Sequence, residues 1–383
     1  ELATVSKPIK IKITGDASGF NKTLGGVEGR LSKFGGLAKA GAKTAALGFA
    51  AVGAAAGVAA FKGVSAFTDF QSSMNEVFTL MPGASEEAMA AMSGLVKDFS
   101  REFGVLPEET IPALYQSLSA GVPPGNVFEF METAQKAAKG GVTDLTTAVD
   151  GITSVVNAYG EEVVDATQAS DLMFTAVRLG KTTFGEMSAS LSAVTPIASG
   201  LGVGFEEITG SLAALTAKGV PTAQATTQIR GALSDLAKAG SKSDKVFRDL
   251  AGEGFQDFIA GGGTMQEAFQ MLADEADASG KSVLDMLTAN GGEDFAAVMA
   301  EMGDSAGATD TAFETMDSGL ASSFDKIKAN IAVLMVAIGE KLAPLVQRVT
   351  DWIVDNSDEI AAAFQQAMAF VGRAVAVVMP VLQ

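Results

Sequence analysis

The sequence lacks cysteine and histidine altogether. Its 383 residues include 0 Cys and 0 His, and aromatic residues make up only 7%. Without these side chains a protein has no disulfide, no thiolate nucleophile, no structural zinc site and no imidazole base. A chain without cysteine also fits a reducing compartment. We therefore expect no enzyme activity, no catalytic residue, no cofactor-binding residue and no metal site.

Charge is unevenly distributed along the chain. The formal net charge is −18, yet residues 1–62 hold nine Lys or Arg against three acidic residues, a net charge of +6. The remaining residues carry a net charge of −24. An acidic body repels nucleic acid, so we expect no sequence-specific nucleic-acid binding. The basic head suits a membrane surface or an acidic protein wall.

A helix–turn–helix pattern repeats near the middle of the chain with a shift of about 42 positions. The period ends at Gly160 in the first copy and at Gly202 in the second, which is typical of stacked hairpins. A second echo links Gly121 in SLSAGVPP with Gly219 in LTAKGVPT. Such arrays bind and organise partners and seldom carry chemistry. The shift places Leu145 on Met187, Val149 on Leu191, Ile152 on Val194 and Tyr159 on Leu201.

Apolar residues recur at spacings of three and four through every long segment, which predicts an all-α fold. One exception is the alternation of Ile9, Ile11 and Ile13 with lysines, which predicts one short N-terminal strand. We expect an elongated array of helical hairpins with long N- and C-terminal helices. The expected parts are the strand segment 1–15, the basic Gly/Ala-rich helical segment 16–82, the core helical domain 83–240, the looser helical region 241–310 and the long C-terminal helices 311–383.

Four apolar stripes mark the expected buried faces of the core domain, and two capping boxes mark helix starts. A single long helix is expected from about Thr311 to Asn356, with Pro344 as a kink. The stripes are Ile111, Leu114 and Leu118; Val142, Leu145, Val149, Ile152, Val156 and Tyr159; Phe205, Ile208, Leu212 and Leu215; and Ile229, Leu233 and Leu236. The capping boxes are Thr183 with Glu186 and Thr264 with Glu267. Met74, Met81, Met89, Met92, Met131, Met173 and Met187 are expected in the core.

One apolar stretch of the basic head invites two interpretations. Ala45 to Phe61 contains seventeen residues without a charge, between Lys43 and Lys62, and seventeen is near the lower limit for a bilayer span. Gly53 and Gly57 form a small-xxx-small pair that allows close helix contact. The stretch is either a packed helix in a bundle of several chains or a membrane-active segment.

Two features resemble catalytic or binding motifs, and simpler explanations account for both. Gly200–Gly204 precedes a helix, as a phosphate-binding loop does, but a helix precedes it and no Lys-Ser/Thr follows. We interpret it as a turn between helices. Four adjacent carboxylate pairs are expected in first helical turns, where acids complement the helix dipole. These pairs are Glu86-Glu87, Glu108-Glu109, Glu161-Glu162 and Glu206-Glu207.

The stretch from about Phe67 to Leu236 contains FTDFQSSMNEV, PEETIPALYQSLSAGV, TDLTTAVDGITSVVNAYG and the long segment from TTFGEMSASLSAV to TTQIRGALSDL. In their order and spacing these segments resemble the core region of phage tail tape measure proteins. The opening PIKIKITGDASGFNKTL, the segment SVLDMLTANGGEDFAAVMAEMG and the helix SSFDKIKANIAVLMVAIGEKLAPLVQRVTDWI are similar in order and style. Residues 241–310 match loosely, and the long repetitive remainder of such proteins is missing. We therefore expect a piece of a longer chain.

The resemblance implies a helical protein present in several parallel copies inside the tail tube of a virion. Its length would set the tube length, tube subunits would assemble around it, and it would leave ahead of the DNA. The implied partners are further copies of itself, the tail tube protein, tail tip or distal tail proteins, tail assembly chaperones and, during ejection, a host membrane. The implied locations are the tail tube lumen and tip, the host cytoplasm during assembly and the host inner membrane during infection.

Two other classes of protein remain open. A membrane-active, pore-forming helical protein would use 45–61 and the apolar segments after Ile331. Membrane association that resists carbonate extraction would favour that class. An enzyme such as a cell-wall hydrolase is the third class, and turnover of peptidoglycan would reveal it. The sequence offers it no His, no Cys and no cleft-forming acid pair.

Overall fold

The computed structural model describes residues 42–275 and 292–359, together with 362 and 365. Every regular element within these residues is a helix, so the predicted all-α class is confirmed. The predicted strand at Ile9–Ile13 lies outside the described residues. The chain divides into two compact units, Glu1–Lys62 and Gly63–Gln383. The helix α2 (Ala42–Thr79) crosses this boundary, and all that follows concerns the second unit unless stated otherwise.

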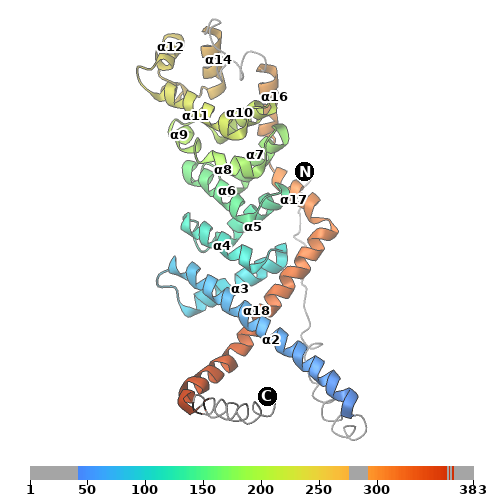
Figure 1. The fold of residues 1–383 in the computed structure, drawn as a ribbon. Coiled ribbons are helices and arrows are strands. Elements are labelled where there is room, and N and C mark those ends of the chain that lie inside the picture. The colour runs from blue at the N-terminus through green and yellow to red at the C-terminus, as the bar shows by residue number, and fades with distance from the viewer. Residues whose placement is uncertain (1–41, 276–291, 360–361, 363–364, 366–383) are drawn as a thin grey trace, which may run out of the picture. The chain divides into compact units, whose positions relative to one another are not determined.

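Short helices follow one another through the second unit and form an array (Figure 1). Helices near one another in the chain pack together, as α4 does on α6, α6 on α8 and α7 on α10. The array helices are α3 (Glu86–Phe103), α4 (Pro107–Ser119), α5 (Val127–Gly140), α6 (Leu145–Tyr159), α7 (Ala166–Leu179), α8 (Phe184–Leu191), α9 (Thr195–Gly200), α10 (Phe205–Ala217), α11 (Thr222–Ala237), α12 (Lys242–Ala251), α13 (Phe255–Ala260) and α14 (Met265–Glu275).

Three later helices run back along the array in the opposite direction (Figure 1). We call them the return segment. α16 (Gly292–Gly303) packs on α10 and α7, and α17 (Ala308–Asp317) packs on α5 and α7. α18 (Leu320–Asp355) packs on α3. The return segment therefore contacts helices that lie far earlier in the chain.

The array shares one hydrophobic core that extends from α2 to the return segment. The predicted stripes lie in it, with every member buried or half-buried except Val142, which is 79% exposed. Val142 is wrong as a core residue because it precedes α6 and adopts a φ of 52° in the turn. The methionines singled out from the sequence are all buried or half-buried, as expected.

Polar caps begin the helices where the sequence predicted them. Both halves of the Thr183–Glu186 capping box form at the start of α8. At the start of α14 the Glu267 N–H donates to the Thr264 hydroxyl at 3.1 Å, and the Glu267 carboxylate accepts the Thr264 N–H at 2.9 Å. Each box provides partners for backbone N–H groups that a helix start leaves free.

The repeat is visible in the backbone of the turns. Gly160 and Gly202 both have positive φ, 87° and 79°. Gly121 and Gly219 likewise have φ of 97° and 90°. After each of the latter pair, the next residue's N–H bonds back over five residues, from Val122 to the Ser117 carbonyl and from Val220 to the Leu215 carbonyl. The second echo is thus a repeated helix end of the same geometry, and the two glycines of the first echo share a positive φ.

Successive layers of the array are joined by side chains that donate to the free carbonyls at helix ends. Asn157 donates to the Ala120 carbonyl beyond α4 at 2.9 Å. Ser199 donates to the Ala158 carbonyl in the last turn of α6 at 2.6 Å. Gln256 donates to the Gly200 carbonyl at the end of α9 at 3.4 Å. We call these three bonds the interlayer ladder; each gives a partner to a carbonyl that its own helix cannot satisfy.

Two expected helices are interrupted in the structure. The second copy of the repeat divides into α8 and α9, because Pro196 lacks the N–H that a continuous helix needs. The long C-terminal helix does not begin near Thr311: α17 ends at Asp317, and α18 starts after Gly319. Pro344 does lie inside α18, as expected.

Candidate functional site

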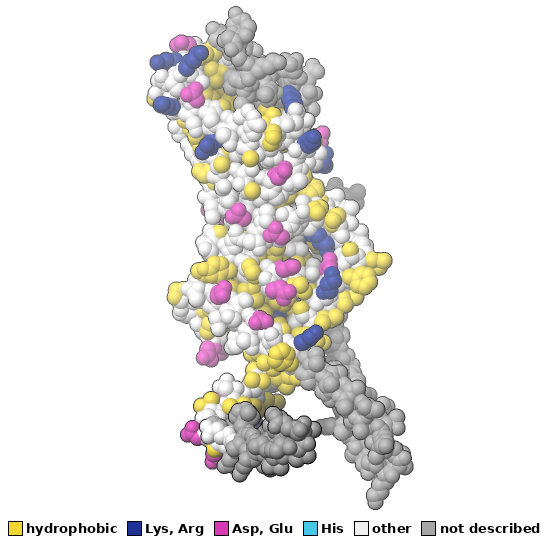
Figure 2. All heavy atoms as spheres, in the orientation of Figure 1, with side chains coloured by type: hydrophobic (Ala, Val, Ile, Leu, Met, Phe, Trp, Pro, Cys, Tyr) yellow, Lys and Arg dark blue, Asp and Glu magenta, His cyan; other side chains and the backbone are white. Residues whose placement is uncertain are grey.

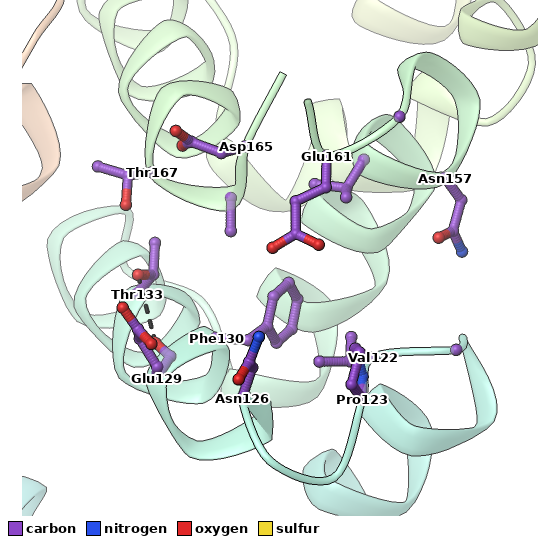
Figure 3. A pocket seen from close by; sticks show the side chains of 14 residues that line it. Val122, Pro123, Asn126, Glu129, Phe130, Thr133, Asn157, Glu161, Asp165 and Thr167 are labelled. Carbon is purple, nitrogen blue, oxygen red and sulfur yellow. Dashed lines mark hydrogen bonds between the residues drawn. The ribbon is translucent and has the colours of Figure 1, made fainter. Parts of the chain in front are cut away.

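A pocket of about 590 Å³ opens between the α4–α5 turn and the α6–α7 turn (Figure 3). The α4–α5 turn and α5 provide Asn126, Glu129 and Phe130 on one side. The α6–α7 turn provides Glu161 and Asp165 on the other. The pocket is therefore a polar, acidic recess between stacked hairpins.

Several polar groups of this pocket already serve the local fold. The Asp165 carboxylate accepts the Gln168 N–H at 2.8 Å and caps α7. The Asn157 amide belongs to the interlayer ladder. Among the described residues, no group of three or more acidic side chains is placed to hold a metal ion.

The glycine-rich stretch is the turn between helices that the sequence predicted. α9 ends at Gly200 and α10 begins at Phe205. The Glu206 carboxylate lies in front of Gly204, where its oxygen would be 2.4 Å from an added β-carbon. A carboxylate in this position repels a phosphate group. The loop therefore does not form an anion cradle.

Three of the four carboxylate pairs begin helices as predicted, and one does not. Glu86-Glu87, Glu108-Glu109 and Glu206-Glu207 lie in the first turns of α3, α4 and α10. The expectation for Glu161-Glu162 is wrong, because these residues lie in the turn before α7. The helix starts later, since Asp165 provides its cap.

Glu207 has a second role that the sequence did not reveal. Its carboxylate accepts the Met265 N–H at 2.8 Å and so binds the start of α14, a helix that begins 58 residues later. Burial raises the pKa of Glu207, while the N–H groups of Met265 and Gln266 oppose that rise. The residue therefore joins two layers of the array.

Within the described part of the chain, four ion pairs hold the return segment on the array, and they have the same polarity. In every pair the array provides the cation and the return segment provides the carboxylate. The pairs are Lys97–Glu340 at 2.8 Å, Lys136–Asp310 at 3.0 Å, Lys139–Asp317 at 2.5 Å and Arg178–Glu301 at 2.8 Å. Sequence reasoning missed these pairs, because each joins residues more than a hundred positions apart and no local pattern marks them.

Asp171 of α7 anchors the return segment in a different way. It is 4% exposed and accepts the N–H of Gly307 at 2.7 Å and of Thr309 at 2.9 Å. The neighbouring Ser170 hydroxyl shares a 2.8 Å hydrogen bond with the Thr309 hydroxyl. A buried carboxylate at the N-terminus of α17 is favourable, because that end of a helix carries partial positive charge.

The structure describes little of the apolar stretch in the basic head that was interpreted as a membrane-active segment. Residues 45–61 are part of α2, and the side chains up to 59 lie outside the described residues. Within the part of the chain that is described, α18 is the one helix long and apolar enough to cross a membrane, with a hydropathy of 1.6. That property rests on length and composition alone.

The sequence of the chain is similar to those of known phage tail proteins. The sequence model of the family described as phage-related minor tail protein matches residues 93–286. The probable tape measure protein of Clostridium phage phiCD119 is 28% identical over 296 residues, 72% of this chain and 31% of that protein. The tape measure protein of Pneumococcus phage Dp-1 is 24% identical over 182 residues, 48% of this chain and 16% of that protein. The chain thus matches less than a third of either relative. No solved structure is significantly similar to it.

Proposed function

We propose that this chain, which belongs to the family of phage-related minor tail proteins, is part of a tape measure that templates the tail tube and sets its length. Family membership makes it a structural component of the phage tail and of the virion. The two similar proteins, both named as tape measure proteins, support the more specific role.

The observation that carries the proposal is the interlayer ladder. Each layer of helices is fixed to the next by a side chain that bonds the end of an earlier helix, as Ser199 does at the Ala158 carbonyl. The layers of the array are therefore held to one another in succession. A stack of this kind gives neighbouring proteins a regular surface of defined length, and stacked repeats characteristically present such extended surfaces.

The surface charge suits a protein that shares a tube with DNA. Figure 2 shows acidic side chains spread over the middle and lower part of the visible face of the array, while basic ones gather near α12 and along the right-hand edge. Four basic side chains of the array are occupied in ion pairs with the return segment. An acidic surface repels the DNA phosphates and so does not bind DNA that passes through the tube. The partners we propose are further copies of the chain, the tail tube protein, tail tip proteins and tail assembly chaperones.

A stop codon early in the gene, in the phage that encodes it, tests the proposal. We expect normal heads with tails that are absent or of irregular length, measured by electron microscopy. Supply of the wild-type protein from a plasmid should restore tails of uniform length and serves as the control. Uniform tails of normal length without the protein would contradict the proposal.

The second part of the proposal concerns ejection. We propose that the protein leaves the tail ahead of the DNA and that residues 37–63 then enter a bilayer, with Lys39, Lys43 and Lys62 at its surfaces. Seventeen helical residues span about 26 Å, slightly less than a hydrocarbon core of about 30 Å. Insertion should therefore require several copies together.

Substitution of Ala50 and Ala54 by Asp tests this part separately. We expect complete tails of normal length that fail to deliver DNA, since charge opposes insertion. Normal infection would leave the segment as a packing element only. Failure to build tails would give it a role in assembly instead.

A membrane-active, pore-forming protein is the second candidate, and the length and hydropathy of α18 favour it. The purified chain would then release dye from lipid vesicles and resist carbonate extraction. A chain that stays in solution beside vesicles would exclude this candidate.

A further inference from the structure

α18 buries its small side chains and exposes its large ones. Its buried positions are Ser322, Ala329, Val333, Val336 and Gly339. Five large apolar side chains on another face are exposed, between 51% and 81%. We call this face the outer seam. It consists of Leu320 at 81%, Phe324 at 61%, Ile327 at 53%, Ile331 at 51% and Leu334 at 52%.

This arrangement reverses the usual rule for a helix on a protein surface. Large aliphatic side chains are normally the ones taken out of water, and contiguous apolar patches on a surface mark interaction sites. In Figure 2, hydrophobic side chains gather along α18 and around its junction with α17. The outer seam therefore calls for a partner that covers it.

The spacing of the seam indicates what that partner is. From Leu320 to Leu334 the steps are four, three, four and three residues, the period at which two helices pack side by side. In heptad terms Phe324 and Ile331 occupy a positions, and Leu320, Ile327 and Leu334 occupy d positions. Every a and d position of the seam is apolar, so two such helices laid side by side in register bury all five side chains against their counterparts.

The charges beside the seam also favour a second copy of the chain. The flanking e and g positions hold Ser323, Lys328, Asn330 and Met335, and none is acidic. Lys328 is paired with Asp325 of its own helix at 3.0 Å. Two copies with a net charge of −18 each repel one another overall, so a face without acidic flanks is where they can meet.

We propose that two copies of the chain pair in parallel and in register through their outer seams. α18 is already held as a helix by its contacts with α3, so pairing does not have to order it. Near Ile338 the helix meets α2 at Gly63, and the seam ends there. The inference rests on the proposed function in one respect, that several copies lie together in one tail, and it names the surface by which they meet.

Sedimentation equilibrium of the full chain over a range of concentrations tests the pairing. We expect a dimer that dissociates on dilution. Joint substitution Ile327→Glu and Ile331→Glu should raise the dissociation constant by at least about 100-fold, as expected for two central interface residues. Val163→Glu is the matched control, because Val163 is 65% exposed in the turn before α7. Circular dichroism should show equal helix content in all three proteins.

The absence of cysteine allows a direct test of register. Ile327→Cys should form a disulfide between two copies under mild oxidation, because d positions of parallel helices face one another. Val163→Cys should form no disulfide between copies, because position 163 lies outside the seam. If instead Leu320→Cys couples only to Leu334→Cys when the two variants are mixed, the helices run antiparallel and the inference is wrong.

Other outcomes would also overturn the inference. A chain that is monomeric at all concentrations, or a dimer that survives the double substitution, removes the seam as the interface. If a monomeric chain binds lipid vesicles and this binding depends on Ile327 and Ile331, the seam is a membrane-binding surface and the inference is wrong. If the chain is a monomer but the phage still needs it for tails of uniform length, only this inference is wrong. If the chain dimerises through the seam but the phage builds uniform tails without it, only the proposed function is wrong.

Discussion

The carbonyl oxygen of Gly63 on α2 lies directly against the α-carbon of Gly339 on α18. A β-carbon added at Gly339 would stand 1.9 Å from that oxygen and 2.5 Å from the β-carbon of Phe67. No real contact is so short, so the two helices can cross here only because residue 339 is glycine. The first and last long helices of the second unit are therefore in backbone contact.

Gly339→Ala should push α2 and α18 apart where they cross and so destabilise the protein. We expect a loss of about 1–3 kcal/mol, as for an overpacked core. Gly63→Ala should cost less, because its nearest neighbour is the flexible end of Ile338 at 2.9 Å. Gly94→Ala is the control, since nothing lies within 4 Å of it and the substitution should stabilise α3 by up to about 1 kcal/mol. Urea unfolding measures all three.

Leu191 tests the repeat, because it occupies the position of Val149 one period later. Both side chains are fully buried. Leu191→Ala should therefore lower the free energy of unfolding by about 2–5 kcal/mol. Val163→Ala, at an exposed site, should stay within about 0.5 kcal/mol of wild type. Equal effects of the two substitutions in a denaturant titration would mean that the repeat does not form a packed array.

The sequence allowed the helical class, the repeated turns and both capping boxes to be predicted, since each depends on residues within one or two turns of each other. Gly160 and Gly202 were identified by local pattern, and their φ values agree. The helix break at Pro196 was missed because the apolar spacing continued through it. The return segment was not foreseen as a separate layer. Its contacts depend on pairs such as Lys97 and Glu340, which are 243 residues apart and leave no local trace.

Glu206 and Glu207 should differ in their effect on stability although they are adjacent. Sequence reasoning gave both the modest role of acids at a helix start, worth about 0.3–1 kcal/mol. Glu206→Ala should remain in that range. Glu207→Ala should cost about 1–3 kcal/mol, because the Met265 N–H loses its acceptor. Hydrogen exchange at the start of α14 should accelerate only in the Glu207 variant; acceleration in both would contradict this assignment.

Asp171→Ala should loosen the return segment without unfolding the array. The substitution leaves the N–H groups of Gly307 and Thr309 without acceptors in a buried place, at a cost of about 1–3 kcal/mol. Hydrogen exchange in residues 308–317 should rise. Asp144→Ala is the control, because Asp144 caps only its own helix α6. If the control variant exposes residues 308–317 to the same extent, the anchor lies elsewhere.

Asp317 should make stability depend on pH in the acid range. Burial opposes ionisation, but hydrogen bonds from Lys139, Lys326 and Ser322 outweigh it and hold the pKa of Asp317 far below its ordinary value of 3.8. Because the pKa of Asp317 is lower in the folded state than in the unfolded state, its ionised carboxylate stabilises the folded protein above pH 3.8. This stabilisation is lost as the pH falls toward the folded-state pKa.

Asp317→Asn should therefore be less stable than wild type at pH 7, and the difference should narrow steadily below about pH 4. Urea midpoints of the two proteins at pH 7 and pH 3 measure this. Asp98→Asn serves as the comparison, because Asp98 is 71% exposed and pairs only with Arg101 of its own helix. A difference of equal size at both pH values would show that the Asp317 cluster does not depend on ionisation.

The contact between Gly63 and Gly339 also decides how the molecule would carry mechanical tension. The whole array lies between these two residues in the sequence, while in space they touch. When the two ends of the second unit are pulled apart, the force therefore acts first on this crossing, and the stacked hairpins bear none of it. While the crossing holds, the unit transmits force as a short link. Once it opens, the array becomes part of the loaded chain and could extend by roughly 900 Å at full stretch.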